Sequence, residues 1–373
     1  MIKTDIIKGQ KSWILDSKKI RLSLTEKGGH MAPVVFMKDS DNPIEPFYIN
    51  PWADEDLDLS NLPDVLDPLR GDFFCLTFGG DNSWGGEVHP PHGESSGSMW
   101  ILGDNLEENS ITLKMDTKVR KGTITKKIFL KENENNLYIS HRIVDFAGPI
   151  SPGHHVIFPG GTTKNISTSP IKFGYTDDNR HGGYFDEEYY SLAAFKKFDS
   201  LKMVPTIWKD KEYTDCSEFP AREGFMDLLQ VYNKPREEFA WTAVTVPEEG
   251  YLWFALKDQA ILPSTVLWMA NKGRHQKPWY GRNVCIGVED VCSHLGDGLS
   301  VAAERNSLNE EGIITSHYLK EGSEMTVKYI QGVARIPDGF KRVRSIEKRD
   351  EGVEIKSFSG KSIHTKLDPG FLL

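Results

Sequence analysis

The feature that most constrains this chain is a recurring alternation of apolar and polar residues in short runs, separated by turn residues. Alternation with a period of two residues indicates a β-strand with one buried face, and polar turns between successive runs indicate antiparallel pairing. Such runs occur at residues 19–25, 110–115, 122–130, 137–146, 324–330 and 352–358.

Helical patterns are scarce, and we expect short helices only at residues 187–198 and 224–232. Because strands do not alternate with long helices, a parallel α/β sheet is disfavoured. The sequence therefore predicts an all-β fold, a large antiparallel two-sheet β-sandwich. We expect a single domain over residues 1–373, with rim loops or insertions at about 43–68 and 160–220, which are rich in turn-forming and polar residues.

Composition narrows the possible partners. The 373 residues are 27% charged and 38% hydrophobic, which is typical of a globular chain that can bury a core. The net charge of −9 argues against nucleic acid as a partner, because phosphate binding needs a basic face.

No apolar stretch approaches the ~20 residues of a membrane span, and no secretory signal is visible, so we expect a cytoplasmic protein. The sequence does not indicate an oligomeric state.

Two polar segments lie where predicted strands begin or end. Arg70 precedes an apolar run, and its five fixed donors suit the binding of vicinal hydroxyls or a carboxylate; a surface salt bridge is the simpler alternative. His92 follows two stiffening prolines and precedes Gly93, which permits close approach of a ligand. The alternatives for this second segment are an exposed proline-rich turn or a metal site shared with His89, for which the spacing is a weak signal.

Two further segments place imidazoles and a carboxylate in strands. His154 and His155 are adjacent, so their side chains point to opposite faces and only one can face a given cleft. Glu289 follows an apolar strand, where a carboxylate is either paired and structural or a general base. Burial beside apolar neighbours would raise the pKa of Glu289 and make it a stronger base.

Taken in order, these segments resemble the galactose mutarotase superfamily, in particular its aldose 1-epimerase and hexose-6-phosphate 1-epimerase branches. The resemblance covers roughly residues 15–335. The family's Arg-Gly entry to an apolar strand is matched at residues 70–71, its His-Gly pair at 92–93, its His-x-x-Phe strand at 155–158 and its Gly-x-Glu strand at 287–289.

The sequence departs from the family at two places. Glu94 stands where the epimerases usually have an apolar or aromatic residue. The family's Asp on a middle strand is matched only by Asp177 or Asp178, and Asp178 is kept as the candidate substrate ligand.

The resemblance implies an enzyme that interconverts sugar anomers by acid–base ring opening, with no metal and no cofactor. It implies Glu289 as the base, His155 as the acid with His154 as its substitute, and His92 as a hydrogen-bond partner of the ring oxygen. Arg70 would hold hydroxyls, and Trp279 would lie against a sugar face, a role open also to Trp268 and Tyr280.

Three alternatives stay open. The chain could be a carbohydrate-binding protein that has lost catalysis on the same fold. It could be a cupin-like metal enzyme that uses His89, His92, one of the adjacent histidines and Glu289. It could also act as an isomerase or lyase on an acidic sugar, bound by Arg70, Arg274 and Arg282.

Overall fold

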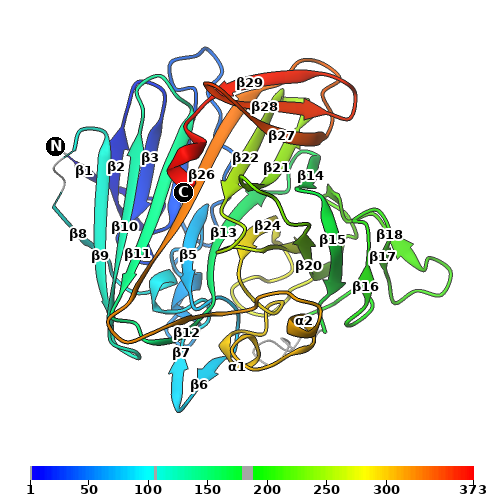
Figure 1. Cartoon of the computed structure of the whole chain (residues 1–373), viewed down its shortest axis with the longest axis horizontal. Coiled ribbons are helices and arrows are strands. Elements are labelled where there is room, and N and C mark those ends of the chain that lie inside the picture. Colours follow the sequence, from blue (N-terminus) through cyan, green and yellow to red (C-terminus); the bar gives the residue numbers. More distant parts are fainter. Residues whose placement is uncertain (1, 105–106, 179–187) are drawn as a thin grey trace.

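The computed structural model describes residues 2–104, 107–178 and 188–373, and these residues form two large antiparallel sheets (Figure 1). The larger sheet has eleven strands, in the spatial order β1 (Lys3–Ile7), β2 (Gln10–Asp16), β3 (Arg21–Thr25), β4 (Met31–Val35), β5 (Asp72–Leu76), β13 (Pro152–Pro159), β24 (Val284–Val291), β23 (Ser264–Asn271), β20 (Phe225–Asn233), β15 (Ile171–Thr176) and β16 (Lys197–Phe198).

The second sheet has nine strands. Their order is β19 (Glu218–Phe219), β14 (Lys164–Thr168), β21 (Ala240–Val246), β22 (Tyr251–Lys257), β26 (Glu324–Arg335), β11 (Asn136–Val144), β10 (Gly122–Leu130), β9 (Ser110–Thr117) and β8 (Ile101–Leu102). The predicted antiparallel β-sandwich is therefore confirmed.

Smaller elements surround the two sheets. A three-stranded sheet of β27 (Val343–Arg349), β28 (Gly352–Ser357) and β29 (Ser362–Lys366) packs on the outer face of the nine-stranded sheet, at the top of the view (Figure 1). Three further strand pairs are β6 (Asn82–Trp84) with β7 (Glu87–His89), β12 (Gly148–Ile150) with β25 (His317–Leu319), and β17 (Val204–Pro205) with β18 (Tyr213–Thr214).

Helix is limited to short pieces in the described part of the chain. They are α1 (Leu299–Ala302), α2 (Ser307–Glu310) and the 3₁₀ turns η1 (Asp64–Leu66), η2 (Glu94–Ser96), η4 (Pro247–Glu249) and η5 (Pro369–Leu372). None of these helices is long or apolar enough to cross a membrane.

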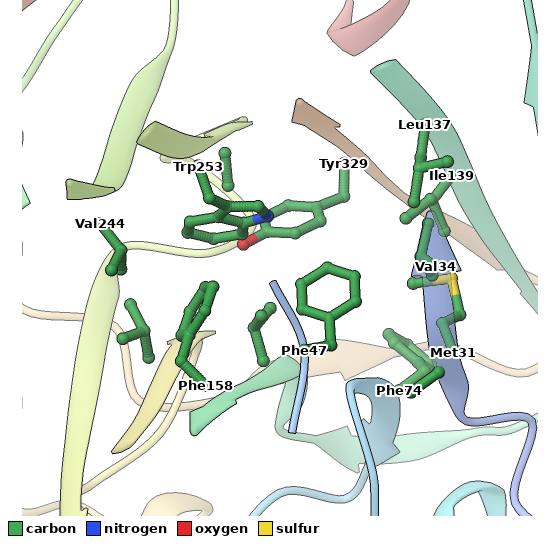
Figure 2. Packing of buried hydrophobic residues seen from close by; sticks show 14 of the residues in the cluster. Met31, Val34, Phe47, Phe74, Leu137, Ile139, Phe158, Val244, Trp253 and Tyr329 are labelled. Carbon is green, nitrogen blue, oxygen red and sulfur yellow. The ribbon is translucent and has the colours of Figure 1, made fainter. Parts of the chain in front are cut away.

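The core between the two sheets is built from alternate residues of their strands. Phe74 of β5 and Phe158 of β13 meet Trp253 of β22 and Tyr329 of β26 in this layer (Figure 2). The intervening residues of β5, β13, β23 and β24 point to the other face of the larger sheet, where they form a second buried cluster. The larger sheet is therefore buried on both faces along these strands.

Burial of both faces of the larger sheet explains why one of the two expected helices is a strand. The helix expected at 224–232 is wrong, because this segment is strand β20, paired along its length with β23. Both faces of β20 are largely buried, so its apolar run lacks the alternation that distinguishes strand from helix. The helix expected at 187–198 is not found in its described part, 188–198, which ends in β16; residue 187 lies outside the described residues.

The two expected rim segments differ in their roles. Within 160–220, β14 and β15 are paired members of the two large sheets, so this part of the segment belongs to the sandwich. The 43–68 segment contains only the turn η1 as regular structure. Its residues Ile44 and Phe47 join the core between the sheets, and from Tyr48 onward it packs on the outer face of the larger sheet. Trp52 and Leu66 are buried there beside Phe73 and Trp279.

Candidate active site

A cavity of about 500 Å³ lies over the outer face of the larger sheet, a size within the usual range for ligand sites. We call it the outer-face cavity. Side chains of the 43–68 segment line part of it, among them Val65 and Leu66. Its polar lining comes from Asp81, His92, His155, Arg274 and Glu289, and its aromatic lining from Phe73, Phe78, Trp268 and Trp279.

His155 and Glu289 lie side by side in this cavity because β13 and β24 are paired with these two residues directly opposite each other. Directly paired residues share a face of the sheet. The Nε2 atom of His155 lies 3.2 Å from Oε1 of Glu289. The structure shows no hydrogen bond between these two atoms, and Oε1 is itself buried without another hydrogen-bond partner among the described residues. Phe73, opposite His155 on β5, stacks on the imidazole at a centroid distance of 4.5 Å.

A glycine creates the space for the carboxyl group. Gly287 precedes Glu289 by two residues on β24 and so shares its face of the sheet. A Cβ atom at position 287 would lie 2.2 Å from Oε1 of Glu289, far inside van der Waals contact. The Gly-x-Glu pattern is thus a steric requirement of this carboxyl position.

His92 is held by its backbone as much as by its ring contacts. Its φ of 60° is left-handed, and its amide donates to the carbonyl of Gly79 at 2.8 Å. Gly93 follows with a φ of 75°, and a Cβ there would lie 1.8 Å from the carbonyl oxygen of Leu76. Only glycine allows this approach, which brings the His92 ring to 5.1 Å from that of His155.

Burial controls the protonation of these groups. Removal from water raises the pKa of Glu289 well above its ordinary value and lowers that of His155 well below. Burial also lowers the pKa of His92 to about 4. These shifts favour the uncharged form of each group, a protonated carboxyl on Glu289 and a neutral imidazole on His155.

Of the two adjacent histidines, His155 faces the outer-face cavity and His154 does not. His154 points into the core between the sheets, where Nδ1 lies 2.9 Å from Oδ2 of Asp72 and the ring stacks on Tyr329 at 4.1 Å. The expected substrate contact of His154 is not possible from this position, because β13 itself separates it from the cavity.

Arg70 is also away from the cavity. Its guanidinium group is buried and donates to the backbone carbonyls of Pro68, Ile7 and Lys8 at 2.8–3.1 Å. These bonds tie the N-terminal hairpin to the start of β5, so the side chain has a structural position and not the expected contact with sugar hydroxyls.

Of the two remaining predicted substrate ligands, one lines the outer-face cavity and the other does not. Trp279 lines the cavity, edge-on to Trp268 at 5.5 Å, whereas Asp178 is half-buried after β15 and is not among the described lining residues. Glu94, where the sequence departs from the family, accepts hydrogen bonds from the amides of Lys118 and Val119 and so holds a loop.

Arg274 also lines the cavity, although the sequence suggested it only as one of three arginines that would bind an acidic sugar. Its guanidinium carbon lies 5.0 Å from the ring centroid of Trp279 and 5.6 Å from that of Trp268, and its Nε lies 2.5 Å from Oε1 of the buried Glu188. In sequence it looks no different from Arg282, which pairs with Glu55 at the surface. Only the fold separates the two arginines.

The described part of the chain contains no cluster of three or more His, Cys, Asp or Glu side chains arranged to hold a metal ion. His89, which the cupin-like alternative needs, lies outside the cavity lining and contacts Glu87 at 3.3 Å.

The architecture of this chain is similar to that of several solved structures. A galactose mutarotase-like protein from Clostridium acetobutylicum superposes with a TM-score of 0.61 at 13% identity, over 90% of this chain and 99% of the other. A proposed aldose 1-epimerase from Escherichia coli K12 gives a TM-score of 0.59 at 13% identity, over 88% and 100% of the two chains. No family model matches the sequence, and no curated protein matches it significantly.

The chain thus has the galactose mutarotase-like fold, and the resemblance predicted from four short motifs is confirmed at the level of fold. At 13% identity the likeness does not extend to activity, so the chemistry must be argued from the outer-face cavity of this chain.

Proposed function

We propose that the protein interconverts the anomers of a reducing sugar in the outer-face cavity. The observation that carries this proposal is the contact between His155 and Glu289, two proton-transfer groups 3.2 Å apart in a cavity walled by aromatic rings. The fold is compatible with the proposal, but one fold supports many functions.

The reaction needs an acid and a base that act on neighbouring atoms. The base removes the proton of the anomeric hydroxyl while the acid protonates the ring oxygen; the bond between C1 and the ring oxygen breaks, and an open-chain aldehyde forms. Rotation about the C1–C2 bond and the reverse proton transfers close the ring on the other face of C1. Both oxygens are bonded to C1, so the acid and the base must lie side by side, as His155 and Glu289 do.

The neutral pair can generate both catalytic forms in one step. Once a small reorientation aligns the two groups, transfer of the carboxyl proton of Glu289 to Nε2 of His155 leaves a carboxylate as the base and an imidazolium as the acid, with no change in net charge. A sugar hydroxyl that donates to the carboxylate favours this transfer, because it replaces the hydration that burial removed. The ring of His92 lies 5.1 Å from that of His155 in the same cavity, and we assign it a hydrogen bond to the ring oxygen or a neighbouring hydroxyl.

The rest of the cavity favours an uncharged sugar. Trp268 and Trp279 offer aromatic surface to the C–H face of a pyranose. The charge of Arg274 is balanced by Glu188, and neither Arg70 nor Arg282 is among the described lining residues. An acidic sugar would therefore meet one neutralised arginine and not the three that the alternative assumed.

The test is an anomer-exchange measurement by NMR or polarimetry across hexoses, pentoses and uronic acids. We expect acceleration for at least one neutral sugar. Glu289→Gln should reduce it by roughly 10³-fold, whereas Glu321→Gln, in an exposed turn, should leave it unchanged. Sugar binding without acceleration in the unmodified protein would favour the non-catalytic alternative, and a fully active Glu289→Gln variant would refute the base assignment.

A further inference from the structure

A buried thiol contacts the second histidine of the outer-face cavity. Sγ of Cys75 lies 3.5 Å from Nδ1 of His92. Cys75 is on β5, two residues after Phe73, so its side chain shares the cavity side of the sheet and lies beneath the imidazole. We propose that Cys75 is a positioning residue that fixes the tautomer of His92, so that Nδ1 accepts and Nε2 carries the proton. This inference rests on the proposed function and assigns His92 the part of a hydrogen-bond donor to the sugar.

The ring of His92 has little freedom to turn away from the thiol. Phe73 and Phe78 contact it edge-on at centroid distances of 5.9 and 5.2 Å, and the ring of His155 meets it at 5.1 Å. The left-handed backbone of His92 and the close approach of Gly93 to Leu76 set the direction from which the side chain enters. A partial rotation of the imidazole would break these ring contacts. A half-turn about the Cβ–Cγ bond would keep them but put Cδ2 in the place of Nδ1, and the thiol would then lose its acceptor.

Both partners of this contact are uncharged. Burial, with Glu289 and Asp72 nearby, raises the pKa of the Cys75 thiol well above its usual value, so the sulfur keeps its hydrogen. His92 is a neutral imidazole because burial lowers its pKa, and such a ring has one donor nitrogen and one acceptor nitrogen.

The direction of the hydrogen bond follows from donor and acceptor strength. Thiol sulfur is a weak acceptor, whereas an imidazole nitrogen with a free lone pair is a good one. The contact is therefore better satisfied by S–H donating to Nδ1 than by N–H donating to sulfur. The remaining proton of His92 must then reside on Nε2.

With this tautomer, His92 can donate a hydrogen bond to a bound sugar. A ring oxygen of a sugar can only accept a hydrogen bond, so it needs a donor, and Nε2–H of His92 provides one. With the other tautomer, His92 would present a lone pair and repel that oxygen. Cys75 thereby acts on the substrate through His92 without touching it.

The test reads the tautomer directly in the full-length protein. In ¹⁵N-labelled protein we expect the Nδ1 resonance of His92 at the position of an unprotonated nitrogen and the Nε2 resonance at that of a protonated one. Cys75→Ser keeps a donor and should preserve this pattern. Cys75→Ala removes the donor and should move both resonances towards a mixture of tautomers.

The kinetic expectation follows the spectra. Cys75→Ala should lower kcat by roughly fivefold, the worth of one ordinary hydrogen bond, with a smaller change in KM, and Cys75→Ser should recover most of the loss. Cys285→Ala is the matched control, since Cys285 is a buried cysteine of the same cluster whose sulfur accepts from Asn283, with no hydrogen bond to a histidine among the described residues. It should change neither spectrum nor kcat.

A protonated Nδ1 in the unmodified protein, or an unchanged tautomer in Cys75→Ala, would overturn the inference. Should Cys75→Ala fail to fold, the spectrum of the unmodified protein and that of Cys75→Ser still decide. The expected tautomer in a protein without anomer exchange would support the role of Cys75 and refute the proposed function alone.

Discussion

Replacement of Gly287 by alanine tests the steric basis of the site. The added methyl would lie 2.2 Å from Oε1 of Glu289, and its other neighbours are Cδ of Glu289 and Cβ of Trp268, both at 3.2 Å. The carboxyl oxygen must therefore retreat by ~1.2 Å to reach an ordinary contact of about 3.4 Å. A displacement of ~1 Å at a reacting group costs ~10²-fold in rate.

The same substitution should affect stability far less than activity. The closest atom is the end of a flexible side chain, so the protein can adapt by rotating Glu289. Overpacking costs ~1–3 kcal/mol, and the lower chain entropy of alanine in the unfolded state offsets ~0.5–1 kcal/mol of it. We expect Gly287→Ala to lower the free energy of unfolding by less than ~2 kcal/mol.

Anomer exchange measured by NMR, together with urea unfolding, checks both expectations. Gly161→Ala is the control, because a Cβ at position 161 meets nothing within 4 Å. Its exchange rate should match that of the unmodified protein, and its free energy of unfolding should rise by ~0.5–1 kcal/mol through the lower entropy of the unfolded chain. A Gly287→Ala variant that folds normally and keeps the full exchange rate would show that the carboxyl group is not needed in the position described here.

Three other expectations follow from buried groups. Because the pKa of Glu289 is raised well above 4.5 and that of His155 lowered well below 6.5, the active pair of one protonated and one unprotonated group persists from the lowered pKa of His155 to the raised pKa of Glu289; catalysed exchange should be flat over this interval and fall on either side of it, and a profile with its two limbs at the ordinary values of 4.5 and 6.5 would contradict the assignment. Lys257 and Asp290 form a fully buried ion pair at 2.5 Å, so Lys257→Met should reduce the free energy of unfolding by ~3–5 kcal/mol in urea titration, through the carboxylate left unpaired. Arg70→Met should lower the midpoint of the same titration, because three backbone carbonyls lose their donor, while KM stays unchanged; a raised KM with normal stability would restore the sugar contact expected from the sequence.

Several features of the site could be predicted because they depend on neighbours in sequence. A period of two residues implies that His154 and His155 face opposite sides of a strand, and the structure shows this. The chemical character of Glu289 at the end of an apolar run was equally visible, as was the order of the four motifs.

Other features depend on contacts between distant segments. The structural position of Arg70 could not be predicted, because its partners, the carbonyls of Ile7 and Lys8, lie some sixty positions away in the sequence. The contact of Cys75 with His92 and the difference between Arg274 and Arg282 carry no sequence pattern at all.

The sequence by itself determined the all-β architecture, because alternation along a strand is a local property of the chain, and its four motifs suggested the candidate proton-transfer residues through the family resemblance. The tertiary structure decided which face of the larger sheet became core and which became cavity. That choice depends on where the nine-stranded sheet and the 43–68 segment pack, and on the register that sets His155 opposite Glu289. Pairing and packing are settled by contacts between residues far apart in the chain, which a pattern of neighbouring residues does not contain.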